Sequence, residues 1–478
     1  MPENSYSEIR FVTVPQIETH PDRLSAVGTF FGMTPAPVRG CRFLEIGCGD
    51  GSNLIPMAYA MPESHFIGVD LAGPPIATGC QTIASLDLGN ITLIQGDLRD
   101  IDSAYGDFDY IAAPGVYSWV PADVRDRLVA VCAERLTPQG VAYINYNAYP
   151  GKHVRQMFRE MLQYHTRNSR SAEERIEQAH GLLRFLKQGR GLNAPWQALV
   201  NHEATMLLER STGGLFHDEL EDVNDPVYFH QFAAHAAKHG LQYLSEADVA
   251  ETFDQQDLFG WLGGDWLERE QYMDFLCFRR FRQTLLCRQD VQLHRPPDPD
   301  TIRLLRFSAP CKKVGDGETE GLRGIRLGDL HERVQRVTSA LGDAYPIPLA
   351  FDELITHAGS AATLRQILFQ LVTSGYADIH TFDFPCERAV TAKPKASSLA
   401  RRQAAASSHV VSARHQLLEL DDIGRHLALL MDGSRDHEQL VHDLAAIAGA
   451  PSEEKIREHL PYRLGWMARR GLLERTAG

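Results

Sequence analysis

The chain has 478 residues, of which 44% are apolar and 23% charged, and its formal net charge is −14. This length exceeds what one hydrophobic core serves and predicts several domains, while the acidic balance argues against a nucleic-acid-binding protein. No apolar run reaches the roughly 20 residues of a transmembrane helix, the N-terminus lacks a signal-peptide core, and the eight cysteines show no CxxC spacing. We expect a cytoplasmic protein with reduced thiols that binds neither a membrane nor nucleic acid.

The first 150 residues alternate between strand and helix patterns. Strands are expected at 41–47, 65–71, 90–97, 108–116 and 140–149, and helices over 52–62, 74–88 and 121–140. This alternation predicts a parallel, doubly wound sheet. The expected fold class is α/β, with a Rossmann-like domain over 1–150.

The remaining sequence is predicted to be mainly helical. Residues 151–295 are expected to form a helical regulatory or substrate domain, with a long amphipathic helix over 265–288 whose arginines are salt-bridged. Residues 296–386 and 412–478 combine helices with a closing strand, which is typical of winged-helix-like modules. The Ala-, Ser- and Arg-rich residues 387–411 between them are expected to be a flexible linker.

The loop "FLEIGCGDG" (43–51) follows the first strand. Its glycines, Gly47, Gly49 and Gly51, let a ligand approach the backbone closely, at the strand ends where Rossmann-like folds bind ligands. A dinucleotide and an S-adenosyl group both fit this position. The spacing departs from the dinucleotide fingerprint G-x-G-x-x-G, because Ser52 occupies the position of its third glycine or alanine. Asp50 would repel pyrophosphate, but it can accept hydrogen bonds from an ammonium group.

Two more acids follow at strand ends. Asp70 ends the second strand, where a carboxylate can accept from ribose hydroxyls, as it also does in NAD sites. Asp97 ends the third strand, where it can accept from the exocyclic amine of adenine. The set favours S-adenosylmethionine (SAM) over NAD; the alternative is that each acid only caps a helix.

These residues resemble the motifs of class I SAM-dependent methyltransferases, namely "LEIGCGDG" (44–51), "GVD" (68–70) and "GDL" (96–98). A narrower group is similar over "QIETHPDRL" (16–24), "GVYSWVP" (115–121), "YNAYPG" (146–151) and "FRQTLLCR" (281–288). This group comprises bacterial methyltransferases with a regulatory domain after the catalytic domain, and includes the rickettsial protein-lysine methyltransferases. The resemblance implies SAM as cofactor, a protein lysine as methyl acceptor and a winged-helix-like C-terminal region.

The expected site residues follow from these motifs. Binding of the cofactor is expected at Thr19, His20, Glu45, Gly47, Cys48, Gly49, Asp50, Asp70, Leu71, Asp97, Leu98, Pro114 and Gly115. His20 has an alternative role as the cap of a helix that begins at Pro21. The acceptor amine is expected beside four catalytic residues, whose rings attract cations and whose oxygens accept hydrogen bonds: Tyr117, Trp119, Tyr146 and Asn147. Alternatively, some of these aromatic rings fill the domain junction.

No metal is expected. The acids and His217 in residues 215–230 occupy successive positions that do not converge on one ion, and methyl transfer needs none. These residues are expected to form a substrate-facing or a solvated loop.

Three functions stay open at this stage. The favoured one is methyl transfer to a protein, and residues 1–150, which contain no lysine and many acids, suit a cationic partner. The second is a small-molecule methyltransferase with the helical domain as a lid. The third is a non-catalytic SAM-binding regulator.

Overall fold

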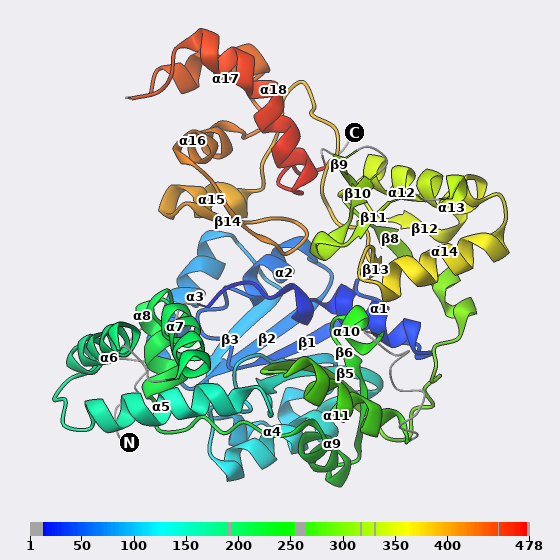
Figure 1. The fold of residues 1–478 in the computed structure, drawn as a ribbon. Helices are drawn as coiled ribbons and strands as arrows, with labels where there is room; N and C mark the ends of the chain where they lie inside the picture. The colour runs from blue at the N-terminus through cyan, green and yellow to red at the C-terminus, as the bar shows by residue number, and fades with distance from the viewer. Residues whose placement is uncertain are drawn as a thin grey trace.

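The computed structural model of the chain describes residues 13–189, 193–253, 264–315, 318–328, 331–447 and 449–475. Within these residues the centre is a seven-stranded sheet with the order β3-β2-β1-β4-β5-β7-β6 (Figure 1). Its strands are β1 (Arg42–Ile46), β2 (His65–Asp70), β3 (Ile91–Gln95), β4 (Phe108–Ala113), β5 (Leu136–Asn147), β6 (Leu241–Glu246) and β7 (Phe281–Arg288). Strands β1 to β5 pair in parallel, whereas β7 runs antiparallel to both β5 and β6.

Helices cover both faces of this sheet (Figure 1). One face carries α1 (Pro21–Phe30), α2 (Leu54–Ala60) and α3 (Gly73–Ser85), and the other carries α4 (Ala122–Arg135) and α9 (Phe229–Lys238). Strand β1 serves both layers: Phe43 belongs to the first core, and Leu44 and Ile46 to the second. Successive strand side chains point to opposite faces, so a strand covered on both sides has apolar side chains on both faces. The predicted Rossmann-like α/β class is confirmed.

The last two strands enter the sheet late in the chain. Between β5 and β6 lie α5 (Lys152–Thr166), α6 (Ala172–Gln188), α7 (Ala194–Leu208), α8 (Thr212–Leu215), the π-helical turn η5 (Phe216–Leu220) and α9. Between β6 and β7 lie α10 (Val249–Phe253) and α11 (Trp266–Cys277). The predicted domain limits, 1–150 and 151–295, therefore divide the strands of a single sheet.

Residues 265–288 do not form the single long helix that the sequence predicts. Helix α11 ends where Phe278 adopts a left-handed backbone conformation with φ of 52°, and β7 follows. The cause is tertiary pairing, because Arg282 is fully buried in the sheet and bonds to the carboxylates of Glu246 (2.6 Å) and Asp274 (2.9 Å). The predicted salt bridges are present, but the prediction that they lie on a helix face is wrong, because Arg282 lies in strand β7.

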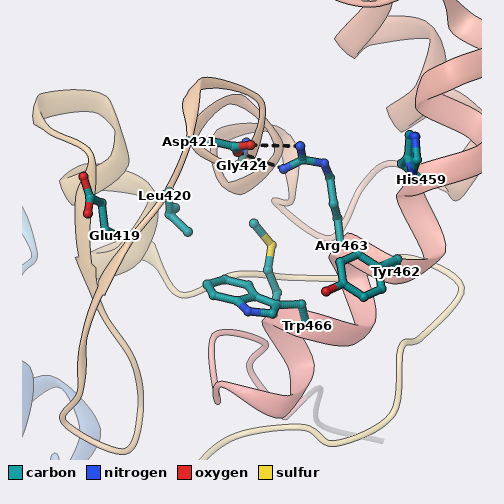
Figure 2. A pocket seen from close by; sticks show the side chains of 9 residues that line it. Glu419, Leu420, Asp421, Gly424, His459, Tyr462, Arg463 and Trp466 are labelled. Carbon is teal, nitrogen blue, oxygen red and sulfur yellow. Dashed lines mark hydrogen bonds and ion pairs between the residues drawn. The ribbon is translucent and has the colours of Figure 1, made fainter.

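The C-terminal region contains α15 (Ser398–Ala406), β14 (His409–Val411), β15 (Leu417–Glu419), α16 (Asp422–Leu430), α17 (His437–Ala445) and α18 (Glu453–Arg469). The linker predicted over 387–411 is wrong in part, because α15 and β14 lie inside it. Leu399, Ala400 and Ala404 of α15 are buried. The alanines, which suggested a linker in the sequence, therefore form part of a packed helix face. A hollow of about 490 Å³ lies between α16 and α18, beside the Asp421–Arg463 ion pair (Figure 2).

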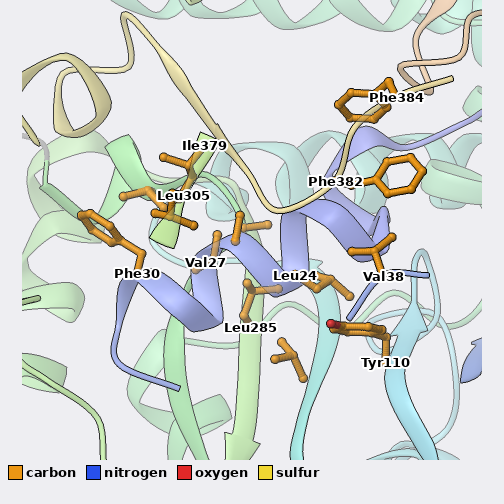
Figure 3. Close-up of a cluster of buried hydrophobic side chains, with 14 of the residues drawn as sticks. Leu24, Val27, Phe30, Val38, Tyr110, Leu285, Leu305, Ile379, Phe382 and Phe384 are labelled. Atoms are coloured by element: carbon orange, nitrogen blue, oxygen red, sulfur yellow. The ribbon is translucent and has the colours of Figure 1, made fainter. Parts of the chain in front are cut away.

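Residues 296–386 lie against the first face of the sheet. They contain η7 (Pro299–Leu304), β8 (Arg306–Ser308), β9 (Lys312–Gly315), β10 (Glu318–Glu320), η8 (Leu322–Gly324), β11 (Arg326–Leu327), α12 (Glu332–Ala344), β12 (Leu349–Ala350), α13 (Phe351–Ala358), α14 (Ala361–Thr373) and β13 (Asp378–His380). Leu24 and Phe30 of α1 share one buried cluster with Leu305 and Ile379 (Figure 3). This module is therefore fused to the sheet through α1. Among the described residues, no helix has the length and apolar character needed to cross a membrane.

Candidate active site

Three glycines form the loop after β1. Gly47, Gly49 and Gly51 have φ values between 56° and 80°, a region that glycine adopts without steric cost. A Cβ atom on Gly47 would lie 2.7 Å from Cγ2 of Val116, and one on Gly49 would lie 2.8 Å from Cγ2 of Thr13. The loop therefore has no room for larger residues at these positions, and its backbone borders a cavity.

Asp70, at the end of β2, holds this loop in place. Its Oδ2 accepts a hydrogen bond from the backbone N–H of Gly49, and its Oδ1 accepts one from the N–H of Ala72, both at 2.8 Å. An ionised carboxylate has about four lone-pair positions. Asp70 lines the cavity and so keeps acceptor capacity for a ligand.

Asp50 and Asp97 also line the cavity, but neighbouring side chains engage both. Asp50 accepts from the hydroxyls of Thr13 at 2.6 Å and Ser52 at 2.5 Å. Asp97 accepts from the guanidinium of Arg99 at 2.6 Å, and this bond lowers the pKa of Asp97. A ligand at either carboxylate has to share it with these partners.

Glu45 is a buried acid in β1 beside the glycine loop. Its Oε2 accepts from Nδ2 of Asn53 at 2.9 Å. Burial raises the pKa of Glu45 to about 8, and the nearby charge of Asp70 acts in the same direction. At neutral pH most Glu45 carboxyls are therefore protonated.

Asn53 connects Glu45 to distant parts of the chain. Its Nδ2 also donates to Oγ1 of Thr19 at 2.9 Å, and its Oδ1 accepts from the N–H of Gln16 at 2.8 Å. The same Oδ1 lies 2.8 Å from Nε2 of His415, which belongs to the turn between β14 and β15. The C-terminal region thus contacts a side chain that lines the cavity.

One cavity of about 980 Å³ extends from the glycine loop to the start of α5. It is formed by the carboxyl ends of β1 to β5, which is where an open α/β sheet binds ligands. The structure brings the following predicted residues together in its lining: Glu45, Gly47, Gly49, Asp50, Asp70, Leu71, Asp97, Leu98, Pro114, Gly115, Trp119 and Asn147.

Three predicted cofactor residues lie outside this lining. Cys48 is buried in the core, and the hydroxyl of Thr19 donates to the carbonyl of Gln16 at 2.8 Å. His20 takes the alternative role of a helix cap, because its Nδ1 accepts from the N–H of Asp22 at 3.1 Å. Burial lowers the pKa of His20 to about 4, so the ring is neutral and can accept this bond. These three residues therefore stabilise the structure around the cavity and do not line it.

Two predicted catalytic aromatics are also core residues. The Tyr146 ring is fully buried and stacks on Phe232 at 4.2 Å between centroids. Tyr117 is 2% exposed, and its hydroxyl bonds to Nδ1 of His235 at 2.9 Å. Both rings fill the junction between the sheet and α9, which was the alternative interpretation, so their assignment to the acceptor pocket is corrected.

The cavity also contains residues that the sequence motifs did not reveal. Thr13, Gln16 and Asn53 surround the glycine loop, and a charged group comes from the middle of the chain: Lys152, Arg155, Arg210, His217, Asp218 and Arg280. His217 and Asp218, expected in a substrate-facing or a solvated loop, lie instead in the helical turn η5, where His217 is buried and both line the cavity. Gln16 and Lys152 lie in or directly after the quoted motifs, whereas Arg155, Arg210 and Arg280 come from segments outside them.

The cations at this far end of the cavity are partly compensated by two buried acids outside its lining, Glu203 and Glu219. Arg155 lies 3.6 Å from the carboxylates of Glu203 and Glu219, and Arg280 bonds to Glu203 at 2.6 Å. Burial lowers the pKa of Lys152, against the opposing effect of Glu219. Within the described residues, Nη1 of Arg155 and both carboxylate oxygens of Glu219 are buried without a hydrogen-bond partner. Native proteins seldom leave such groups unsatisfied unless the site serves a ligand or water.

Three family models match successive parts of the chain. They are described as a methyltransferase domain over 43–140, a predicted methyltransferase regulatory domain over 212–288, and a PKMT C-terminal winged helix domain over 392–451. The third match covers much of the C-terminal region, including α15, which agrees with its folded state.

One curated relative matches most of this chain, and a second matches half of it. The uncharacterized protein RP789 of Rickettsia prowazekii is 31% identical over 474 residues, covering 92% of this chain and 85% of RP789. RP028 of the same organism is 33% identical over 50% of this chain and 96% of RP028. The solved structure of PKMT2 from Rickettsia typhi in complex with AdoHcy is 24% identical, covers 97% of this chain and 99% of that chain, and has a TM-score of 0.84. This structural likeness shows the fold. The chain therefore belongs to the same family as RP789, and it is a class I methyltransferase that carries a regulatory domain and a PKMT-type C-terminal winged helix domain.

Proposed function

We propose that this chain transfers a methyl group from SAM to the side-chain amine of a lysine in a protein substrate. PKMT2 from Rickettsia typhi was solved in complex with AdoHcy, the product that remains when SAM has lost its methyl group. The family model over 392–451 carries the PKMT name as well. These likenesses support both the cofactor and the acceptor class.

The residues around the glycine loop fit SAM. The loop excludes side chains, so it offers backbone to a ligand, and acids surround it: Glu45, Asp50, Asp70 and Asp97. Bound SAM supplies an electrophilic methyl group on a positively charged sulfonium, together with an ammonium group. Carboxylates suit these positive charges, and Asp70 additionally keeps free acceptor capacity for hydroxyls.

Trp119 and Asn147 are the predicted catalytic residues that line the cavity. The Asn147 amide is fixed, because its Nδ2 donates to Oδ1 of Asn224 at 2.7 Å and its backbone N–H donates to Oγ of Ser118 at 2.9 Å. The Trp119 ring can attract a cationic amine by about 0.5–2 kcal/mol. Lysine has a solution pKa of about 10.4, and a partly apolar pocket favours its neutral, nucleophilic form. Most of the catalysis then comes from positioning.

The observation that carries the proposal is the continuity of the cavity. It runs from the glycine loop past Trp119 and Asn147 to Lys152, Arg155 and Asp218, which bear charges of both signs. The side chain of a substrate lysine can enter the cavity between the glycine loop and the charged end. The backbone and the neighbouring residues of the substrate peptide then contact the charged end. A closed apolar chamber, as expected for a small-molecule enzyme with a lid, would lack this polar end.

The test uses SAM with a tritiated methyl group. The full chain is incubated with a lysate of its host, and proteins are separated from small metabolites. Label in a protein band, recovered as methyl-lysine after acid hydrolysis, is the expected result. Asp70→Asn is expected to abolish the label, because the amide weakens the hydrogen bond from the Gly49 N–H and removes a negative charge. Asp422→Asn, whose side chain is 92% exposed on α16, is the matched control that keeps activity.

Other outcomes decide between the alternatives. Label that appears only among small metabolites would exclude the protein acceptor and favour the small-molecule enzyme. Binding of SAM without any labelled product would favour a non-catalytic regulator.

A further inference from the structure

Two helices that cover the same face of the sheet share a cluster of potential metal ligands. Asp126 lies on α4, and His235 and His239 lie one turn apart at the carboxyl end of α9. Residues four apart on a helix face the same side, so both imidazoles project toward α4. Asp126 is 109 residues away from His235 in sequence, so no spacing motif reveals the group.

The three ligand atoms lie close together. Oδ1 of Asp126 is 3.0 Å from Nε2 of His235 and 2.9 Å from Nε2 of His239, and all three atoms lie within 4.8 Å of one another. Two ligands bound at about 2.1 Å around a tetrahedral zinc ion are about 3.4 Å apart. Small side-chain movements would therefore turn the present hydrogen bonds into coordination bonds.

We propose that Asp126, His235 and His239 bind a divalent transition-metal ion of the zinc class. Two imidazoles and one carboxylate are a ligand set that zinc accepts, with solvent completing the tetrahedron. The Asp126 side chain is 61% exposed, so an ion has a path to the site. The carboxyl end of α9 adds a favourable negative potential for a cation. A bound ion would join α9, which lies within the regulatory-domain match, to α4 of the methyltransferase domain.

Tyr117 supplies the outer hydrogen bond of this site. Metal-binding histidines usually donate their second ring N–H to a nearby oxygen, which fixes the ring. Here Nδ1 of His235 lies 2.9 Å from the Tyr117 hydroxyl. With Nε2 on the metal, Nδ1 carries the proton and donates to Tyr117. Without metal, Nε2–H can donate to Asp126 while Nδ1 accepts from the tyrosine.

The test is a Zn²⁺ titration of the full-length chain after treatment with a chelator, followed by competition with a chromophoric indicator. We expect the chain to bind one equivalent of Zn²⁺. Mg²⁺ at the same concentration should not displace it, because Mg²⁺ prefers oxygen ligands. Asp126→Asn and His239→Gln are each expected to weaken zinc binding at least about 100-fold, and Tyr117→Phe about 10-fold. Co²⁺ in place of Zn²⁺ is expected to give intense visible absorption in the unmodified chain, and both ligand variants lose it.

The matched control is His442→Gln. His442 also pairs with a carboxylate, because its Nδ1 lies 3.2 Å from Glu453, but no third ligand is grouped with this pair among the described residues. This variant is expected to bind zinc like the unmodified chain. Thermal unfolding in chelator confirms that each variant is folded, since the side chain of Asp126 is exposed and that of His239 is 21% exposed. Absence of a bound equivalent, or equal affinity in both ligand variants and the unmodified chain, would overturn the assignment.

Discussion

Glu45 is the titratable residue through which the cavity is expected to respond to pH. Its pKa is raised from 4.5 to about 8, so the free protein keeps it protonated across that interval. A cation bound beside the carboxylate favours the ionised form. SAM binding at about pH 6.5 is therefore expected to release a proton from Glu45, and the affinity for SAM rises with pH up to about 8. Calorimetric titration in two buffers with different ionisation enthalpies counts this proton.

Glu45→Gln gives the matching control. Its amide cannot titrate, so proton release should disappear. The free protein offers a second readout: between pH 4.5 and 8 the folded state holds a proton that the unfolded state has lost, so stability falls as pH rises through this window. The variant should show a flatter dependence of its unfolding free energy on pH. Unchanged proton release in Glu45→Gln would assign the proton to another group.

Asn147 and Tyr146 are neighbours on β5 with different expected roles. Asn147 lines the cavity, whereas the Tyr146 hydroxyl only meets the Thr284 hydroxyl at 3.3 Å in the core. Asn147→Ala is expected to lower the rate of methyl transfer by up to about 100-fold through lost positioning. Tyr146→Phe should keep the rate and lose only about 1 kcal/mol of stability. Steady-state assays with tritiated SAM compare the two, and an equal loss in both would contradict this assignment.

At the scale of single elements, β7 depends on the buried charge of Arg282. Its guanidinium bonds to Glu246, Glu270 and Asp274 and lies 4.1 Å from the centroid of the Phe229 ring. Arg282→Met leaves the buried Glu246 and Glu270 without their cation, while Asp274 keeps Arg279 at 2.9 Å. This is expected to cost about 3–5 kcal/mol of unfolding free energy. Urea unfolding measures this loss.

The unfolding free energy that Arg282→Met loses should increase with pH. Burial raises the pKa of Glu270 to about 7 even with Arg282 present, and removal of the arginine raises it further. A carboxyl whose pKa is raised in the folded state makes the free energy of unfolding fall as pH rises. The stability that Arg282→Met loses is therefore expected to be larger at pH 8 than at about pH 5. The control Arg326→Met removes an exposed arginine that bonds to Glu320 at 3.2 Å, and it should cost less than about 1 kcal/mol at either pH. A pH-independent deficit would contradict this account.

The same elements show how far the sequence could predict the fold. Strands β1 to β4 and the glycine loop lie where their apolar runs predict them, and β1 to β3 are each followed by glycine, an acid or both. Strand β5 begins at Leu136, so the end of the helix expected over 121–140 is in fact strand. Strand β7 was missed because its arginines resemble those of an exposed helix, and only pairing with β5 and β6 shows that Arg282 is buried. Helix α15 was missed because its buried residues include alanines, which are equally common in linkers.

The site was predictable to a similar extent. The sheet-edge residues lie at or near strand ends, so the motifs could predict that they meet in one cavity lining. Tyr117 and Tyr146 lie in the same loops and strands but point into the core, and side-chain direction there depends on packing against α9. Arg155, Arg210 and Arg280 reach the cavity from segments outside the cofactor motifs, and a single sequence gives no signal for such a meeting.

At the scale of the whole molecule, the C-terminal region is expected to tune cofactor binding. His415 meets Asn53 at 2.8 Å, and Asn53 in turn bonds to Glu45. Loss of one such hydrogen bond is worth about 0.5–1.5 kcal/mol, so His415→Ala should weaken SAM binding by about 2- to 13-fold. Calorimetry measures this, with His409→Ala, an exposed residue on β14, as the control that keeps affinity. Equal affinity in both variants would show that the contact is only structural.

The place of β7 has a consequence for synthesis on the ribosome. Strand β5 ends at Asn147, but its partner β7 begins at Phe281 and is inserted between β5 and β6. While the intervening helices are being translated, the nascent chain carries β5 as an open strand edge with unpaired backbone groups. Such edges attract other chains, so we expect the emerging protein to be most prone to association until residue 288 has left the exit tunnel.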